Sequence, residues 1–250
     1  MVKLGKDTME KKYKKVLIIG ASSDIGIETC KKFLDNEWEL TAHYNTNNKA
    51  LKILKKKYQS RLNLIKFDLR NIFLLEKYLY ENKKKFLKFD AFVNLSGYFK
   101  STTFQNFKVK DLFEHFNANS FSSLLFLKII LKGMKIRKWG RVVNTSSIGT
   151  KFGGGKKSFC YSLSKFNNEF FPSFYKDLYS NNIMINTLQI GVVKTKMHKK
   201  LPNKNMKKRV SLIPIKRIIE KNEVSNYIYF LCTDQNTTLT GQKLNISGGE

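Results

Sequence analysis

The sequence predicts an α/β protein in which helices cover both faces of a doubly wound, seven-stranded parallel sheet. Seven short runs of apolar residues alternate with segments whose apolar residues recur at helical spacing. Runs such as residues 16–19 are apolar throughout, which is typical of strands buried on both faces of a parallel sheet. Because there is no internal repeat and no linker rich in Gly and Ser, residues 14–250 are expected to form a single domain.

The expected elements alternate from strand to helix along the chain. The first strand, at 16–19, leads through a glycine turn into a helix at 25–34, where Ile25, Cys30, Phe33 and Leu34 share one face. Further strands are expected at 40–44, 62–67, 91–95, 141–145, 183–189 and 243–246, and helices at 48–58, 72–85, 109–134, 158–179 and 222–231. Pro172 should kink the helix at 158–179, or cost about 3 kcal/mol there.

Two stretches fall outside this alternation. Residues 1–13 form a polar, basic leader, which we expect to be a flexible tail. Residues 194–221 form a long basic stretch that contains Pro202 and Pro214. Long excursions of this kind often cover sites, so we expect a lid over the substrate here.

The charge of the chain is strongly positive. It contains 41 Lys and 6 Arg against 19 acidic residues, a formal net charge of +28. Such a field attracts phosphates and acidic proteins. Nucleic-acid readers rely on Arg, however, and here Lys is spread over almost every segment beside 23 Asn and 20 Phe. A general compositional bias toward Lys and Asn explains the charge more simply than nucleic-acid binding does.

Several classes of protein are disfavoured by what the sequence lacks. The three cysteines, Cys30, Cys160 and Cys232, form no CxxC pair, and the three histidines have no metal-ligand spacing, so neither a disulfide framework nor a metal site is expected. The longest apolar run, 124–131, is far shorter than the roughly 20 residues of a membrane helix. With no apolar signal core at its start, the chain is expected to be cytoplasmic, with no membrane partner.

The first strand ends in the sequence Gly20-Ala21-Ser22-Ser23-Asp24-Ile25-Gly26. A tight glycine turn between strand and helix lets backbone N–H groups approach a pyrophosphate at the positive end of the helix. The alternative is that the glycines only allow close packing of strand and helix. A carboxylate at Asp24 would repel a pyrophosphate, but Asp is also a favoured N-cap, and we expect Asp24 to cap the helix.

A second motif places Tyr161 four residues before Lys165. These positions share a helix face, so the ammonium should lower the pKa of the phenol and allow it to exchange a proton near neutral pH. Alone, such a pair is usually a solvated helix face. Here it follows Ser147 at the end of a predicted strand, where sites gather in this architecture.

Taken together, these motifs resemble the short-chain dehydrogenase/reductase family from about Lys15 to Gly249, which implies a Rossmann fold. The resemblance implies a catalytic tetrad of Asn119, Ser147, Tyr161 and Lys165. Asn119 is placed by counting back from Gly140, since Asn117 lies two residues out of register. The resemblance also implies cofactor contacts from Gly20, Ser22, Ser23, Asp24, Ile25, Gly26, Tyr44, Asn45, Asp68, Leu69, Asn94, Ser96, Gly97, Tyr161, Lys165, Gly191, Val193 and Thr195.

Among these, the family pattern assigns adenine contact to Asp68 and nicotinamide contact to Thr195. Residues 240–242 and 248–249 match the C-terminal signature of the family. The chain departs from that pattern at Ile19, Asp24 and Ile190, where the family has Thr, Gly and Pro.

The resemblance implies an NAD(P)H-dependent oxidoreductase that interconverts a ketone and a secondary alcohol. Ser147 would hold the carbonyl oxygen, Tyr161 would donate the proton, Lys165 would hold the ribose and Asn119 would support a proton relay. The chain looks most like 3-oxoacyl-[acyl-carrier-protein] reductases. Two alternatives stay open: a sugar or other small-alcohol dehydrogenase of the family, and a non-catalytic dinucleotide-sensing or nucleic-acid-binding protein.

Cofactor preference depends on the end of the second strand, where an acidic residue would favour NAD. Tyr44 and Asn45 stand there, with Lys49 just beyond, so NADP(H) is predicted over NAD(H). The family and the apolar helices at 109–134 and 158–179 predict a homotetramer, with a dimer as second choice. Eight cations in the lid either reflect the general Lys bias or steer an anionic substrate, such as an acyl group on an acidic carrier protein.

Overall fold

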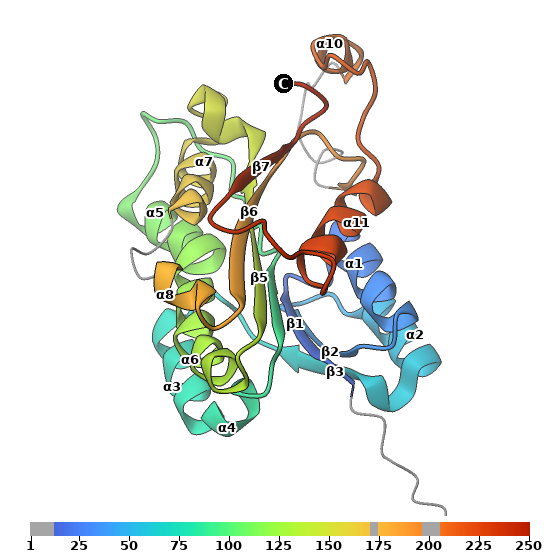
Figure 1. Ribbon diagram of the computed structural model, residues 1–250. Coiled ribbons are helices and arrows are strands. Elements are labelled where there is room, and N and C mark those ends of the chain that lie inside the picture. The colour runs from blue at the N-terminus through green and yellow to red at the C-terminus, as the bar shows by residue number, and fades with distance from the viewer. Residues whose placement is uncertain (1–12, 171–174, 197–205) are drawn as a thin grey trace, which may run out of the picture.

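A computed structural model describes residues 13–170, 175–196 and 206–250. Its central sheet has seven strands in the order β3-β2-β1-β4-β5-β6-β7, and every neighbouring pair is parallel (Figure 1). The strands are Lys15–Ile19 (β1), Glu39–Tyr44 (β2), Leu62–Lys66 (β3), Ala91–Asn94 (β4), Gly140–Ser147 (β5), Ile183–Ile190 (β6) and Lys243–Ile246 (β7). The predicted doubly wound parallel sheet is therefore confirmed.

Helices form a layer on each side of the sheet (Figure 1). On one side lie α1 (Asp24–Asp35), α2 (Lys49–Tyr58) and α11 (Lys221–Leu231). On the other lie α3 (Ile72–Glu81), α4 (Lys83–Phe86), α5 (Val109–Phe116), α6 (Ser122–Arg137), α7 (Phe159–Phe166) and α8 (Tyr175–Tyr179). The short helix α10 (Met206–Ser211) stands apart from both layers.

Two apolar cores separate the sheet from the helices. Alternate residues of β1 belong to different cores, because successive side chains of a strand point to opposite faces. Val16 and Ile18 pack toward α1, while Leu17 and Ile19 pack toward α6, and all four are fully buried. This explains why the strand is apolar at every position rather than at every second one.

Two predicted helices are subdivided in the structure. The helix expected at 72–85 is split at Asn82, whose backbone N–H and side-chain amide both donate to the Tyr78 carbonyl and so end α3. The helix expected at 109–134 contains a π-helical segment, Asn117–Phe121, between α5 and α6. Such segments widen the helix by one residue and are frequent at functional sites.

The helix expected at 158–179 is broken well before its end. α7 stops at Phe166, a 3-10 turn covers Asn167–Glu169, and Phe170 is extended. Pro172 itself lies outside the described residues, but proline has no N–H to donate to the carbonyl of Asn168 four residues earlier. That carbonyl accepts a hydrogen bond from Thr187 Oγ1 at 2.7 Å instead. The interruption is therefore larger than the kink that we predicted.

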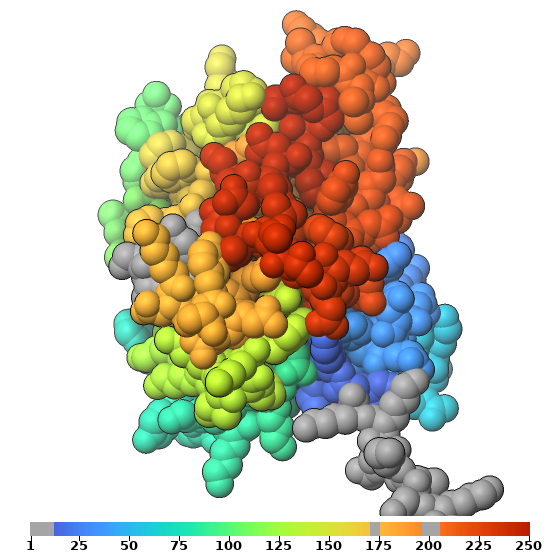
Figure 2. Space-filling model, in the orientation of Figure 1, coloured from blue at the N-terminus to red at the C-terminus, as the bar shows by residue number. Residues whose placement is uncertain are grey.

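The C-terminal segment packs against the stretch after α10. Ile215 N donates to Gly248 O at 3.2 Å, and Arg209 forms an ion pair with the buried carboxylate of Glu250. In the space-filling view the two segments form one continuous surface at the top of the molecule (Figure 2). Residues 206–216 thus have a defined place beside the end of β7, although residues 197–205 lie outside the described part of the chain.

Candidate active site

The glycine turn after β1 is shaped by its neighbours. Gly20 has a φ of +74°, and a Cβ there would lie 2.4 Å from Leu95 O, so only glycine fits. At Gly26 a Cβ would lie 2.6 Å from Ala21 O. Ser23 Oγ accepts a hydrogen bond from Gly26 N at 3.0 Å and caps α1. The backbone from Gly20 to Gly26, including Ser22 and Ile25, therefore makes a close turn at the positive end of a helix.

Asp24 is not the N-cap that the sequence predicts, because Ser23 already occupies that position. Asp24 is the first residue of α1, where the helix dipole favours a carboxylate. Its Oδ2 accepts a hydrogen bond from the backbone N–H of Lys196 at 2.6 Å. The carboxylate thus ties the start of the predicted lid to the glycine turn, 172 residues away in sequence.

His43 in β2 supports the glycine turn, and this role was not predicted from the sequence. Its Nδ1 accepts from Gly20 N at 3.2 Å, and its Nε2 lies 2.9 Å from Phe67 O. Burial lowers the pKa of His43, so the ring is neutral, with Nε2 donating to the carbonyl. The only available signal was its position one residue before the end of β2.

The ends of β2 and β3 carry the residues that the sequence assigns to the adenosine side. Tyr44 ends β2, and Asn45 follows it close enough to Asp68 to contribute to lowering the pKa of that carboxylate. Arg70 donates to both carboxylate oxygens of Asp68, with Nη2 at 2.6 Å from Oδ2, and this pairing holds the pKa of Asp68 below its ordinary value. Arg70 was not predicted as a site residue, although it lies only two residues after Asp68. Leu69 between them is buried.

The turn after β4 is held by the side chain of Asn94. Its Oδ1 accepts from Ser96 N at 3.1 Å and from Ser96 Oγ at 2.6 Å. Lys165 Nζ donates to Ser96 O at 3.0 Å and to Thr145 Oγ1 at 3.1 Å. The predicted Asn94–Gly97 motif is therefore joined directly to α7 and β5.

Asn119 lies in the π-helical segment and is fully buried. Its side chain bonds the backbone of Tyr98 in both directions, with Oδ1 accepting from N at 2.7 Å and Nδ2 donating to O at 3.0 Å. Nδ2 also donates to Ser164 Oγ at 2.9 Å, next to Lys165 in sequence. Asn119 therefore links the chain after β4 to α7.

Ser147, Tyr161 and Lys165 come together at the carboxyl end of β5. The hydroxyl of Ser147 lies close enough to the phenol of Tyr161 to lower its pKa, and Phe99 packs edge-on against the Tyr161 ring, with centroids 5.5 Å apart. Lys165 is one helical turn further along α7 and only 3% exposed. The structure thus brings three predicted catalytic residues to one place, with Asn119 bonded to their surroundings.

The pKa values at this site differ from the sequence-based expectation. Burial raises the pKa of Tyr161 to about 12, although the hydrogen bond from Ser147 opposes that shift. Burial lowers the pKa of Lys165 to about 7. The predicted lowering of the Tyr161 pKa by Lys165 is therefore wrong for the protein's own groups, because desolvation dominates. At neutral pH the phenol carries its proton and can donate it.

The residues after β6 border the same edge of the sheet. Gly191 N donates to Ile246 O at 2.8 Å, and a Cβ at Gly191 would lie 2.7 Å from Ser247 Cα. Val193 pairs with Ile219 in a short parallel bridge, which closes the base of the predicted lid. Thr195 follows, immediately before the residue that bonds Asp24.

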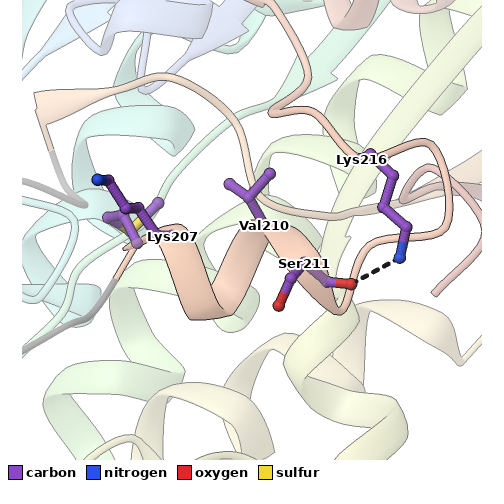
Figure 3. A pocket seen from close by; sticks show the side chains of 5 residues that line it. Lys207, Val210, Ser211 and Lys216 are labelled. Carbon is purple, nitrogen blue, oxygen red and sulfur yellow. Dashed lines mark hydrogen bonds between the residues drawn. The ribbon is translucent and has the colours of Figure 1, made fainter.

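A surface pocket lies within the predicted lid. It is lined by Met206, Lys207, Val210, Ser211 and Lys216, and Lys216 Nζ donates to Ser211 O at 2.8 Å (Figure 3). It contains none of the tetrad. Throughout the described ranges, no helix is long and apolar enough to cross a membrane, and no cluster of three potential metal ligands occurs.

Comparison with known proteins identifies the family. The family model for short chain dehydrogenases matches residues 14–206. A 3alpha-hydroxysteroid dehydrogenase of Mediterraneibacter gnavus is 28% identical over 95% of this chain and 96% of its own. A 3-oxoacyl-[acyl-carrier-protein] reductase, FabG, of Buchnera aphidicola is 26% identical over 96% of this chain and 98% of its own.

Solved structures of similar proteins share the fold of this chain. The structure described as ElxO with NADP bound is 26% identical, covers 95% of this chain and 98% of its own, and superposes with a TM-score of 0.82. YwfH, an NADPH dependent reductase, is 20% identical over the same shares of the two chains, with a TM-score of 0.83, which shows a shared fold. The chain belongs to the short-chain dehydrogenase/reductase family of oxidoreductases.

Proposed function

We propose that the protein is an NADP(H)-dependent reductase that interconverts a ketone and a secondary alcohol. The observation that carries this proposal is the grouping of Ser147, Tyr161 and Lys165, in which a protonated, half-buried phenol lies beside a serine hydroxyl and close to a buried lysine that is fixed by two hydrogen bonds. Without a reaction to perform, burying such a lysine would only cost stability. The direct test is substitution of Tyr161, described in the Discussion.

The residues around the glycine turn fit a dinucleotide. Side chains at Gly20 and Gly26 would collide with the backbone, and Ser23 at the N-terminus of α1 is exposed, where a helix dipole favours a phosphate. The cofactor, when bound, supplies the hydride. Gly20, Ser22, Ser23 and Ile25 would hold its pyrophosphate, while Asn94, Gly97, Gly191, Val193 and Thr195 would border its nicotinamide half.

The chain's own residues would perform the acid-base part of the reaction. Ser147 would donate a hydrogen bond to the carbonyl oxygen and hold the substrate against Tyr161. Tyr161 would give its phenol proton to that oxygen as the alcohol forms. Lys165, fixed by Ser96 and Thr145, would bind the ribose, and Asn119 would keep the chain after β4 in register with α7.

For the substrate class, we favour a 3-oxoacyl thioester. Support comes from the full-length similarity to an acyl-carrier-protein reductase and from basic residues in the predicted lid. A hydroxysteroid or other alicyclic alcohol is the second candidate. It is favoured by the similarity to a hydroxysteroid dehydrogenase and by the aromatic ring of Phe99 against Tyr161.

The preference for an anionic carrier can be tested by salt. Steering by lid cations acts on association and is screened beyond about 8 Å at physiological salt. We expect kcat/KM for an acyl-carrier-protein substrate to fall steeply with salt, while that for a neutral ketone barely changes. Replacing Lys207 and Lys208 by Glu should reduce this difference. Equal salt dependence of kcat/KM for both substrates would mean that the lid cations only reflect the general Lys bias of the chain. Three further lid lysines, Lys199, Lys200 and Lys204, lie outside the described residues.

We predict that kcat/KM is at least about tenfold higher with NADPH than with NADH, a difference of about 1.4 kcal/mol in transition-state binding. β2 does not end in an acidic residue, which would repel the 2′-phosphate of NADPH. The carboxylate of Asp68, which lies nearby, is neutralised by Arg70. Lys49 is exposed just beyond. Lys49→Gln should reduce the ratio of kcat/KM with NADPH to kcat/KM with NADH. A higher kcat/KM with NADH for the unaltered protein would contradict the prediction.

We also propose that the protein self-associates as a homotetramer, with a dimer as second choice. Large apolar side chains are exposed on α7 and directly after it: Phe166, the last residue of α7, is 57% exposed, and Phe170, after the 3-10 turn, is 75% exposed. Exposed apolar surface of this kind marks an interface. Phe171 and Phe174 lie outside the described residues. A monomeric mass by light scattering at micromolar concentration would contradict both assemblies.

A further inference from the structure

A buried carboxylate lies behind the active site. Glu169, in the 3-10 turn after α7, has a side chain that is only 6% exposed. Its Oε1 lies 2.5 Å from Ser146 Oγ, 2.7 Å from Thr150 Oγ1 and 3.1 Å from Gln189 Nε2. Its Oε2 accepts from Lys243 Nζ at 3.0 Å. A buried charge is tolerated only when it is paired and hydrogen-bonded, and here four side chains converge on it from β5, β6, β7 and the 3-10 turn after β5.

Two of these partners lie on either side of Ser147. Ser146 precedes it in β5, and Thr150 lies in the 3-10 turn that begins directly after it. Thr150 Oγ1 is also 2.8 Å from Ser147 O, and Ser147 Oγ accepts from Gly149 N at 3.2 Å. The carboxylate of Glu169 therefore determines the path of the backbone that aims the Ser147 hydroxyl.

Asn168, the residue before Glu169, holds the backbone of Asn119 in place in a similar way. Asn168 Nδ2 donates to Asn119 O at 2.8 Å and to Thr145 O at 3.1 Å. Asn168 and Glu169 both lie in the 3-10 turn where the chain leaves the helix. Two polar side chains of this turn therefore point inward, toward the residues that hold the tetrad.

We propose that Glu169, assisted by Asn168, is a positioning residue of this active site. It acts through Ser146 and Thr150 on Ser147, without touching substrate or cofactor. This inference rests on the proposed reductase function.

Glu169 is charged in the neutral pH range. Burial opposes ionisation, but hydrogen bonds from Ser146 and Thr150 and the ammonium of Lys243 together keep the pKa of Glu169 below its ordinary value. An ionised carboxylate can only accept hydrogen bonds, so the Ser146 hydroxyl must point its hydrogen toward Glu169. Thr150 has a single hydroxyl hydrogen, for which Glu169 Oε1 and Ser147 O compete as acceptors, so the carboxylate controls how firmly Thr150 holds the Ser147 carbonyl.

The test is the variant Glu169→Ala, compared with Lys243→Met. Lys243→Met removes the half-exposed cation, so it should raise the pKa of Glu169 and lower the melting temperature. It keeps the three neutral donors to the carboxylate, so its kcat should stay within about twofold of the unaltered protein at a pH where Glu169 is still ionised. Glu169→Ala should lower kcat by about 10- to 100-fold, because small misplacements of catalytic groups have effects of this size. The KM for NADPH should hardly change, since Glu169 has no contact with the glycine turn.

A purely structural role would lower the melting temperature without altering the pH profile. Because the hydrogen bond from Ser147 lowers the pKa of Tyr161, a misplaced Ser147 should shift the rise of alcohol oxidation to higher pH, as in Ser147→Ala. Pairing Glu169→Gln with Lys243→Met keeps an acceptor without stranding a charge, and it should restore most of the kcat. If Glu169→Ala does not fold, Thr150→Val cuts the same link at nearly constant volume.

An unchanged kcat and pH profile in Glu169→Ala, or in Thr150→Val, would overturn the positioning role if Ser147→Ala is strongly impaired in the same assays. If Ser147→Ala and Tyr161→Phe were themselves fully active, the proposed reductase function would fail instead.

Discussion

Replacing Tyr161 by Phe is expected to reduce kcat for ketone reduction by about 100- to 10,000-fold, the range associated with loss of a general acid. The substitution removes one oxygen from a half-buried ring, and the packing of that ring against Phe99 is preserved. Folding and NADPH affinity should therefore be nearly unchanged. Steady-state kinetics and a fluorescence titration with NADPH measure the two effects separately.

Tyr98 provides a matched control for this substitution. Its hydroxyl donates to Glu114 at 2.7 Å, and its role in the site is carried by its backbone, which bonds Asn119. Tyr98→Phe should therefore keep most of the activity. Near-normal turnover in Tyr161→Phe, or an equal loss in both variants, would show that the phenol of Tyr161 is not the proton donor.

Replacing Lys165 by Met is expected to reduce both kcat and NADPH affinity, with kcat/KM falling at least about 100-fold. The ammonium is fixed by Ser96 O and Thr145 Oγ1, where it would face the ribose of the cofactor. Unlike Tyr161→Phe, this variant should thus also fail in the binding titration. Intact NADPH affinity in Lys165→Met would contradict the assignment.

The low pKa of Lys165 also predicts how the free energy of unfolding changes with pH. Burial lowers its pKa in the folded protein to about 7, well below the ordinary value of a lysine in the unfolded chain. The folded protein therefore binds fewer protons than the unfolded chain at pH values between the two, and its stability from this group increases with pH. In the protein without nucleotide, Lys165→Met should gain relative stability at pH 6, and the gain should shrink toward pH 10 in thermal melts.

The sheet and the catalytic positions were predictable because their signals are local. Apolar runs such as β1 show burial on both faces, and the motifs at Gly20, Asn94 and Tyr161 occur at fixed distances from strand ends. The break in the catalytic helix was predictable in kind, since Pro172 cannot continue it. The length of the interruption was not predictable, because the helix ends where Asn168 forms hydrogen bonds with Thr145 of β5 and Thr187 of β6.

The supporting contacts could not be predicted, since they join residues far apart in sequence. His43 meets the glycine turn across 23 positions, Asp24 meets Lys196 across 172, and Glu169 meets Lys243 across 74. The pKa of Tyr161 was mispredicted for a related reason. Sequence spacing shows that Lys165 is close, but only the fold shows that burial outweighs its charge.

The most direct test of the reductase proposal measures the transfer of hydride from NADPH to the substrate carbon. The protein would be incubated with a 3-oxoacyl thioester or a neutral ketone and NADPH deuterated at the transferring position of the nicotinamide, and the product would be analysed by mass spectrometry. We predict an alcohol with one deuterium on the carbinol carbon, formed in equal amount to the NADPH consumed, and little product with Tyr161→Phe. Binding of NADPH without any deuterated alcohol across a panel of ketones would contradict the proposal.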